Sequence, residues 1–244
     1  MIEKDESQIS AFYDDLSVRQ KHVGINHRHL SIMKWCEELG LKPKHKVLEM
    51  GCGIGTVSEL LLRYLSTSGS LLAMDISERN IKIAKNRLSS KYKNANFILG
   101  DVLKFELNEK YDLILLPDVL EHIPSEKHLK LFLKLRDCLY ETGFILIHIP
   151  DRLYQEWLMK NKKNKMQIID QALYIRDLSQ IMQEAGLKIV FLKSCSIYHK
   201  GFEYQVLKVV HQGISKYQFR ENPWADSKYR RAKKRIQYLL RGFK

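Results

Sequence analysis

Cysteine is scarce in this sequence and shows no metal-binding spacing. The 244 residues hold four cysteines, none in a CxxC pair: Cys36, Cys52, Cys138 and Cys195. Neither a disulfide framework nor a zinc knot is therefore expected. There is also no apolar run long enough to cross a bilayer, and the first ten residues, MIEKDESQIS, are too polar for a signal peptide. These absences predict a reduced, cytoplasmic protein.

Acidic residues are outnumbered, and the formal net charge is +13. The excess is concentrated in residues 216–244, which hold ten lysines and arginines against Glu221 and Asp226. Apolar side chains at helical spacing over 226–240 predict a basic amphipathic helix. Three partners remain open for it: the domain itself, an anionic membrane surface, which would make the protein peripheral to the membrane, or the phosphates of RNA.

Glycines gather in one segment, 46–56, with the sequence KVLEMGCGIGT. An apolar strand precedes Gly51, Gly53 and Gly55, and a 3.6-residue period predicts a helix over 57–65. Such a loop lets a ligand lie against bare backbone, next to the unpaired N–H groups of a helix start.

The glycine spacing differs from the dinucleotide-binding fingerprint, because Thr56 stands where that fingerprint has its third glycine. The glycines instead alternate behind Glu49 as ExGxGxG. In this form the segment resembles the first motif of the class I S-adenosylmethionine (SAM) dependent methyltransferases. The resemblance implies that Glu49 orders the loop around the methionyl part of SAM and that the loop, including Cys52, contacts this cofactor.

Two acids follow the next strands. A strand over 70–76 (SLLAMDI) contains Asp75 and Ile76, at the distance from the glycines where a nucleotide-binding unit places its ribose-binding carboxylate. A strand over 96–99 precedes Asp101 and Val102, and the resemblance implies that Asp101 accepts from the adenine amino group beside the Val102 backbone. A helix cap or a solvated turn is the alternative for each acid alone.

The fourth and fifth strands are predicted over 111–116 (YDLILL) and 144–149 (FILIHI). The fourth runs into PDVLEHIP, where the EHIP run resembles small-molecule members of the family such as the ubiquinone-pathway O-methyltransferases. The resemblance places Asp118 beside the sulfonium. Ligands of open α/β sheets bind at the carboxyl ends of the strands, where all these residues lie.

The alternation of strands and helices, closed by a hairpin over 187–195 and 204–210, predicts an α/β fold with a doubly wound, seven-stranded, mostly parallel sheet of Rossmann-like type. We expect a SAM-binding domain over 44–212, N-terminal helices over 1–43 that cover the active site, and a tail over 213–244. The segment 152–172 falls where this family elaborates its substrate cover. A helix packed on the sheet edge is the alternative.

The N-terminal region carries further candidates. Tyr13, in a helix predicted over 4–17, could close over the donor. The following segment, VRQKHVGINHRH, is rich in residues that could contact a ligand, and a second helix is expected over 29–39. Plain surface exposure is the alternative for the three histidines of that segment, His22, His27 and His29.

Methyl transfer to a hydroxyl needs a base, and His122 and His148 lie at the ligand edge of the sheet. Alternation along FILIHI leaves open whether His148 points into the cleft, and a structural histidine is the alternative for both. Asp118, Glu121 and His122 are spaced to share one helical face and could bind a divalent ion. Caps or donor contacts explain the same acids, and no metal is predicted.

The sequence thus predicts a SAM-dependent methyltransferase that acts on a hydroxyl, or as second choice an amine, of a small or lipid-like metabolite. Base methylation is disfavoured: LPDV replaces the [DNS]PP[YF] loop of the amide methyltransferases, and Cys138 and Cys195 lack the surroundings of a Pro-Cys nucleophile. Two alternatives remain, an RNA methyltransferase with a phosphate-binding tail and a SAM-binding scaffold without catalysis. The sequence contains no motif that names the acceptor or the oligomeric state.

Overall fold

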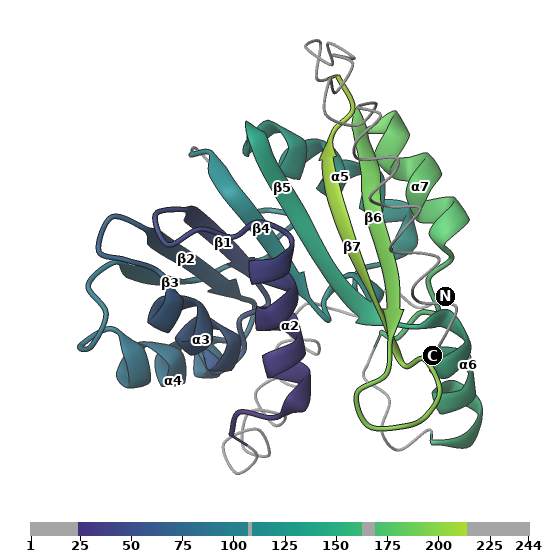
Figure 1. Cartoon of the computed structure of the whole chain (residues 1–244), viewed down its shortest axis with the longest axis horizontal. Helices are drawn as coiled ribbons and strands as arrows, with labels where there is room; N and C mark the ends of the chain where they lie inside the picture. The colour runs from purple at the N-terminus through teal and green to yellow at the C-terminus, as the bar shows by residue number, and fades with distance from the viewer. Residues whose placement is uncertain (1–23, 107–108, 163–168, 214–244) are drawn as a thin grey trace, which may run out of the picture. The chain divides into compact units, whose positions relative to one another are not determined.

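The computed structural model describes residues 24–106, 109–162 and 169–213. Its seven strands form one sheet in the order β3-β2-β1-β4-β5-β7-β6 (Figure 1). The strands are β1 (Lys46–Met50), β2 (Ser70–Asp75), β3 (Ala95–Leu99), β4 (Tyr111–Pro117), β5 (Leu139–Pro150), β6 (Leu187–Cys195) and β7 (Tyr204–His211). The helices are α2 (His27–Glu38), α3 (Thr56–Tyr64), α4 (Glu78–Leu88), α5 (His128–Asp137), α6 (Arg152–Asn161) and α7 (Ile175–Glu184), with 3₁₀ turns η1 (Leu120–His122) and η2 (Ser125–Lys127).

Strands β1 to β5 pair in parallel, and β7 pairs antiparallel with both β5 and β6. The predicted α/β fold with a mostly parallel, seven-stranded sheet is confirmed. β5 begins at Leu139 rather than at the predicted Phe144. The prediction missed its first residues because residues 140–142 are exposed, and they and Gly143 lack the apolar pattern of a buried strand. The order of the chain reverses between β1 and β4, whose carboxyl ends define the crevice of a doubly wound sheet.

The side chains of β1 contribute to both halves of the core. Val47 faces the layer that contains α2, α3 and α4, whereas Leu48 and Met50 face the layer that contains α5 and α7 (Figure 1). All three side chains have no exposed surface. Covering both faces in this way explains the nearly continuous apolar runs of the central strands.

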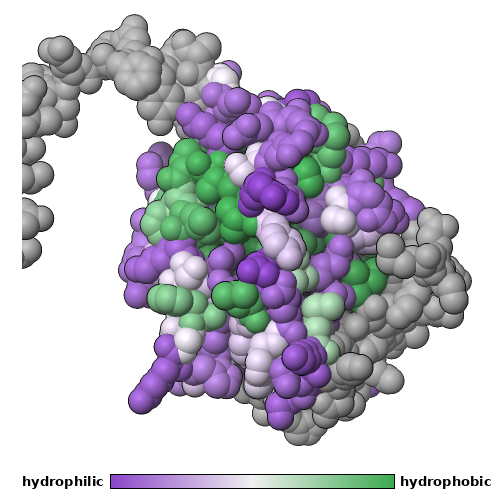
Figure 2. All heavy atoms as spheres, turned by 90° about the vertical axis from the view of Figure 1, so that its right-hand side faces the viewer, coloured by the Kyte–Doolittle hydropathy of each residue, from purple (hydrophilic) through white to green (hydrophobic). Residues whose placement is uncertain are grey.

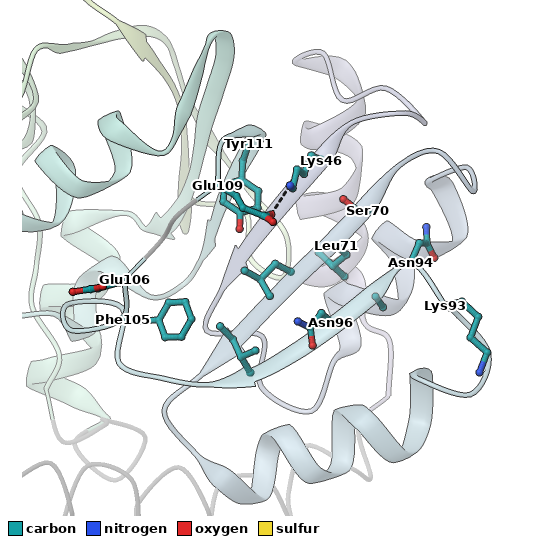
Figure 3. Close-up of a pocket in the computed structure, with 13 residues that line it drawn as sticks. Lys46, Ser70, Leu71, Lys93, Asn94, Asn96, Phe105, Glu106, Glu109 and Tyr111 are labelled. Carbon is teal, nitrogen blue, oxygen red and sulfur yellow. Dashed lines mark ion pairs between the residues drawn. The ribbon is translucent and has the colours of Figure 1, made fainter.

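One part of the sheet has no helix over it. The connection from β3 to β4 contains no helix in its described residues, 100–106 and 109–110, and a cavity of about 500 Å³ lies there against β1, β2 and β3. Figure 3 shows its lining, with Phe105 on one side and Tyr111 beside the ion pair between Lys46 and Glu109. The cavity contains none of the predicted site residues, so it is separate from the candidate site.

Several predictions lie outside the described residues. They are the helix over 4–17 with Tyr13, and the basic helix over 226–240. The domain boundaries remain predictions. None of the helices within the described ranges is long and apolar enough to span a bilayer.

Candidate active site

The glycine loop between β1 and α3 depends on backbone conformations that other residues avoid. Gly51, Gly53 and Gly55 have φ values of 72°, 54° and 81°. A Cβ on Gly51 would lie 2.3 Å from the Cγ2 atom of Val119, which follows β4. The Gly51 N–H donates to the carbonyl of Met74 at 2.8 Å, so the loop bends over the end of β2. The loop is therefore held against the ends of both neighbouring strands.

Asp75 ties this loop to β2 and to the start of α4. One carboxylate oxygen accepts the Gly53 N–H at 2.7 Å, and the other accepts the Ser77 N–H at 2.9 Å and the Asn80 side-chain amide at 3.1 Å. Ser77 in turn caps α4 by accepting the Asn80 N–H at 3.0 Å. The acid predicted to bind ribose thus points at the glycine loop from a fixed position.

Glu49 is completely buried beneath the loop. One of its oxygens accepts the Ser58 hydroxyl at 2.5 Å, and the other has no hydrogen-bond partner within the described ranges. Burial raises the pKa of Glu49 to about 8, the nearby Asp75 adds to the rise, and the Ser58 hydrogen bond opposes it. The group is therefore neutral over much of the physiological range. Burial likewise raises the pKa of the Cys52 thiol, which stays uncharged.

The second predicted acid, Asp101, follows β3. Because β2 and β3 are parallel neighbours, Asp75 and Asp101 stand at the same end of the sheet. One Asp101 oxygen accepts the N–H of Leu103 at 2.8 Å, which shapes the turn after the strand. Ile76 and Val102, the predicted neighbours of the two acids, are half-buried.

Asp118 follows β4 and is the one non-glycine residue with positive φ, 56°, in the described part of the chain. Its N–H donates to the His148 carbonyl at 2.8 Å, and its Oδ1 atom lies 2.5 Å from the Nδ1 atom of His148. Because a carboxylate can only accept, Nδ1 carries the proton and Nε2 is the acceptor of the neutral ring. That Nε2 atom is buried and has no partner among the described residues. The sequence left the direction of His148 open, and the structure turns it toward Asp118.

Arg28 completes this group from α2. Its Nη1 atom lies 2.8 Å from Asp118 Oδ2, so both carboxylate oxygens are engaged. Burial raises the pKa of Asp118, but attraction to His148 and Arg28 outweighs this and lowers it to about 2. The ring of Tyr204, on β7, stacks on His148 at 4.8 Å. An ionised Asp118 therefore links α2, β4 and β5.

His122 lies in the same region but makes different contacts. Its Nδ1 atom lies 2.7 Å from the Ile169 carbonyl and 3.1 Å from an Asp170 oxygen. Burial lowers the pKa of His122, but the charges of Glu121 and Asp170 outweigh it and raise the pKa. Gln171 adds a hydrogen bond to the Ile123 carbonyl at 2.7 Å. His122 thus fastens the chain after α6 to the EHIP segment.

The interpretation of Asp118, Glu121 and His122 as one helical face is wrong. Asp118 has a left-handed conformation, and the turn over Leu120–His122 is a short 3₁₀ helix. Within the described ranges, no three or more His, Cys, Asp or Glu residues are placed to hold a metal ion.

Three residues that contact the candidate site were not predicted from the sequence: Arg28, Val119 and Tyr204. Arg28 lies in the segment VRQKHVGINHRH, where only the histidines were singled out. Of these, His29 belongs to the capping box of α2 with Asn26, and burial followed by the charge of Arg28 lowers its pKa to about 4. The contacts of Val119 and Tyr204 join strands that are far apart in the sequence. A local sequence pattern therefore does not predict them.

The residues at the carboxyl ends of β1, β2 and β3 fit a nucleoside-bearing donor. Three glycines with positive φ form a tight loop after β1, two acids stand at neighbouring strand ends, and Glu49 keeps a buried oxygen without a partner among the described residues. This combination on this strand order defines a Rossmann-like methyltransferase.

The comparison with protein families agrees. A family model with the description "Methyltransferase domain" matches residues 25–192. The chain belongs to this family, among the class I SAM-dependent methyltransferases.

Curated relatives match parts of the chain. A malonyl-[acyl-carrier protein] O-methyltransferase 2 of Ilyobacter polytropus is 30% identical over 142 residues, which cover 54% of this chain and 49% of the relative. A ubiquinone biosynthesis O-methyltransferase of Coxiella burnetii is 31% identical over 94 residues, 38% of each chain. The chain thus spans half or less of the length of these relatives.

Solved structures share the fold over most of the chain. A magnesium protoporphyrin IX methyltransferase from Synechocystis PCC 6803 with bound SAH has a TM-score of 0.67 at 18% identity and covers 85% of this chain and 100% of its own. A SAM-dependent methyltransferase from Clostridium acetobutylicum has a TM-score of 0.61 at 17% identity, with 86% and 94% covered. At these identities the likeness concerns the fold alone.

Proposed function

We propose that this chain transfers the methyl group of SAM to a hydroxyl of a small or lipid-like metabolite, with an amine as the second choice of acceptor. The observation that carries the proposal is the contact between Asp118 and His148 at the ends of β4 and β5, which leaves the buried Nε2 atom of His148 without a partner among the described residues. Both relatives above are O-methyltransferases by name, which supports oxygen as the attacking atom.

Bound SAM supplies an electrophilic methyl group on a sulfonium. The protein's part is to hold the donor, position the acceptor and exclude water. We assign the holding to the glycine loop with Cys52, to Glu49, to Asp75 with Ile76 and to Asp101 with Val102. Tyr13 remains a proposed cover. Asp118, predicted beside the sulfonium, has both oxygens engaged, which favours an orienting role over direct donor binding.

In the proposed step, His148 Nε2 accepts the proton that the acceptor hydroxyl loses as its oxygen takes the methyl group. Asp118 fixes the ring so that Nδ1 keeps its proton, and it stabilises the imidazolium that forms. Because Nε2 has no exposed surface, the acceptor must displace a neighbour, and Tyr204 stacks directly on the ring. His122 is the second candidate; its Nδ1 lies 2.7 Å from the Ile169 carbonyl, and its Nε2 lies 3.8 Å from Glu121 Oε1.

The test compares His148→Ala and His122→Ala in the full chain. Purified protein is incubated with methyl-labelled SAM and extract fractions of lipids, small metabolites and RNA. We expect label in the lipid or small-metabolite fraction, a loss of at least about 10²-fold in turnover for the base variant, and unchanged SAM affinity by calorimetry for both variants. Full turnover in both variants contradicts a histidine base, and no label in any fraction supports a non-catalytic SAM-binding protein.

RNA is the alternative acceptor, on the strength of the charge of residues 216–244 alone. Label in the RNA fraction, with binding that weakens steeply as salt rises, supports it. A compact neutral acceptor predicts a turnover that hardly depends on salt. For either acceptor we propose a cytoplasmic protein, at the membrane periphery if the tail over 226–244 contacts anionic lipid.

A further inference from the structure

Helix α6 shows its apolar side to solvent. The one residue that it buries is polar, Gln155, whereas Leu153 is 63% exposed and Trp157 is 47% exposed. A surface helix of a globular domain normally does the reverse. Two more large apolar side chains stand out from the loop 196–203 between β6 and β7, Tyr198 at 51% and Phe202 at 67%. We call α6 and this loop together the aromatic rim.

The two parts of the rim lie side by side. The ring of Tyr154, in α6, lies 6.2 Å from that of Trp157 and 5.9 Å from that of His199 in the loop. In Figure 1, α6 stands at the lower right, near the place where β6 ends and β7 begins. Figure 2 views this side of the molecule; its broad green apolar area lies in the upper half, and smaller green areas lie among purple polar surface below it.

The loop is held rigidly in its outward position. The buried carboxylate of Glu203 accepts the backbone N–H groups of Ile197 at 2.7 Å, Tyr198 at 2.6 Å and His199 at 3.1 Å, and it also contacts the His199 ring. Four contacts to one buried group fix the turn. The exposure of Tyr198 and Phe202 is therefore built into the fold.

The free charge of the rim is positive. Lys160 in α6 and Lys200 in the loop have no ion pair within the described ranges, nor has Lys162 directly after α6, whereas Glu156 of α6 is paired with Arg152 at 2.5 Å and the acid of the loop, Glu203, is buried. Aromatic side chains that project among unpaired lysines match the boundary between anionic headgroups and acyl chains. A protein interface also buries apolar area, but lysine is depleted in it. The unpaired lysines therefore favour an anionic lipid surface over a protein partner.

The rim stands at the candidate site. Tyr154 lies 6.4 Å from Tyr204, ring centre to ring centre, and Tyr204 stacks on His148. We propose that the aromatic rim docks on an anionic phospholipid surface and that the acceptor enters the site from the lipid phase. The docking stands independently of catalysis, while the route of the acceptor rests on the proposed function.

The test is cosedimentation of the full chain with phosphatidylcholine vesicles, with and without phosphatidylglycerol. Trp157→Ala combined with Phe202→Ala should weaken binding to the anionic vesicles at least about tenfold. The matched control is Tyr140→Ala, a 42% exposed aromatic at the far end of β5, which should bind as wild type. Equal binding by wild type and the double variant overturns the proposal, as does the absence of any binding.

A second measurement separates the rim from the basic tail. In a Trp224→Phe variant the remaining tryptophans are Trp157 and the buried Trp35. Lipids brominated near the headgroup should then quench Trp157 fluorescence. Unquenched emission at saturating vesicles assigns the binding to the tail and overturns the proposal, and so does a self-association that the double variant abolishes.

Failure of the proposed function gives a different result. A chain that binds vesicles through Trp157 but never transfers label to any fraction keeps the docking surface and loses the acceptor route. If both proposals hold, the double variant loses turnover on vesicle-borne acceptor and keeps it on a short, water-soluble analogue.

Discussion

Asp118 Oδ1 and His148 Nδ1 lie 2.5 Å apart at the ends of two neighbouring parallel strands, β4 and β5. The left-handed backbone of Asp118 turns its carboxylate back toward the strand that carries the histidine. Backbone strain of this kind costs about 1–3 kcal/mol and persists where the surroundings enforce it. Here the enforcement comes from the Asp118 N–H bond to His148 and from Arg28.

Asp118→Asn should therefore reduce turnover while SAM binding changes little. The amide can donate as well as accept, so it no longer dictates which nitrogen of His148 carries the proton. We expect a loss of at least about 10²-fold in kcat, measured with saturating labelled SAM and the acceptor fraction that takes up label. The double variant with His148→Ala should be no slower than His148→Ala alone, because the two residues act as one unit. Additive losses would contradict the pairing.

Gly51→Ala should destabilise the protein and abolish donor binding. The added methyl would lie 2.3 Å from Val119 Cγ2, and the residue would keep a φ of 72°. Strain from φ alone is worth about 1–2 kcal/mol, and the clash adds to it, so we expect a loss of more than 2 kcal/mol in urea unfolding.

The control for that variant is Gly24→Ala. Gly24 has a similar φ of 61°, and a Cβ there would meet nothing within 4 Å. It should show the backbone cost alone. If the two variants lose equal stability, the contact with Val119 has no energetic importance.

The sequence was sufficient for the fold because its strands and helices carry strong local signals. The apolar runs of the strands, the helical spacing after them and the glycines at 51, 53 and 55 each act within a few residues of one another. Glycine spacing and the acids after the strands also carried the family resemblance, which the family match confirms.

The contacts around His148 could be predicted from the sequence only in part. His148 was a candidate, but its partner on β4, its cation on α2 and its stacking ring on β7 come together only in the folded sheet. For the segment that contains α6, the sequence left open a substrate cover and a helix packed on the sheet edge. The helical periodicity of apolar residues identifies the apolar side of a helix. It does not determine whether that side faces the core or the solvent.

Asp75 and Asp101 should differ in how strongly they affect donor binding. Asp75 stands at the carboxyl end of β2 and also holds the glycine loop by accepting the Gly53 N–H. The hydrogen bond that Asp101 accepts from the Leu103 N–H shapes only its own turn. Asp75→Asn should weaken SAM binding by about 10- to 100-fold, the range of a charge-assisted hydrogen bond, and Asp101→Asn by less. Calorimetric titration with SAM measures both, and unfolding in urea checks that each variant is folded. Undiminished affinity in both variants would remove the two acids from the donor site.

Glu49 should make the unliganded protein less stable as pH rises. Its pKa is about 8 in the folded chain against a reference of 4.5, because burial disfavours the charged form. Between these values the unfolded chain has lost the proton and the folded chain keeps it, so the free energy of unfolding falls with rising pH. The slope has an upper limit of about 1.4 kcal/mol per pH unit. Glu49→Gln removes this titration, and its stability relative to wild type should rise steadily across the interval.

Urea unfolding of wild type and Glu49→Gln at several pH values measures that difference, in which the other titrating groups cancel. Ser58→Ala is the matched control, because it removes the hydrogen bond to Glu49 and keeps the acid, so it should retain the slope. The Ser58 bond lowers the pKa of Glu49, so its loss should extend the slope to higher pH. Parallel stability curves for wild type and Glu49→Gln would mean that Glu49 ionises in the folded state as it does in water. In that case its buried oxygen has a partner that stabilises the charge.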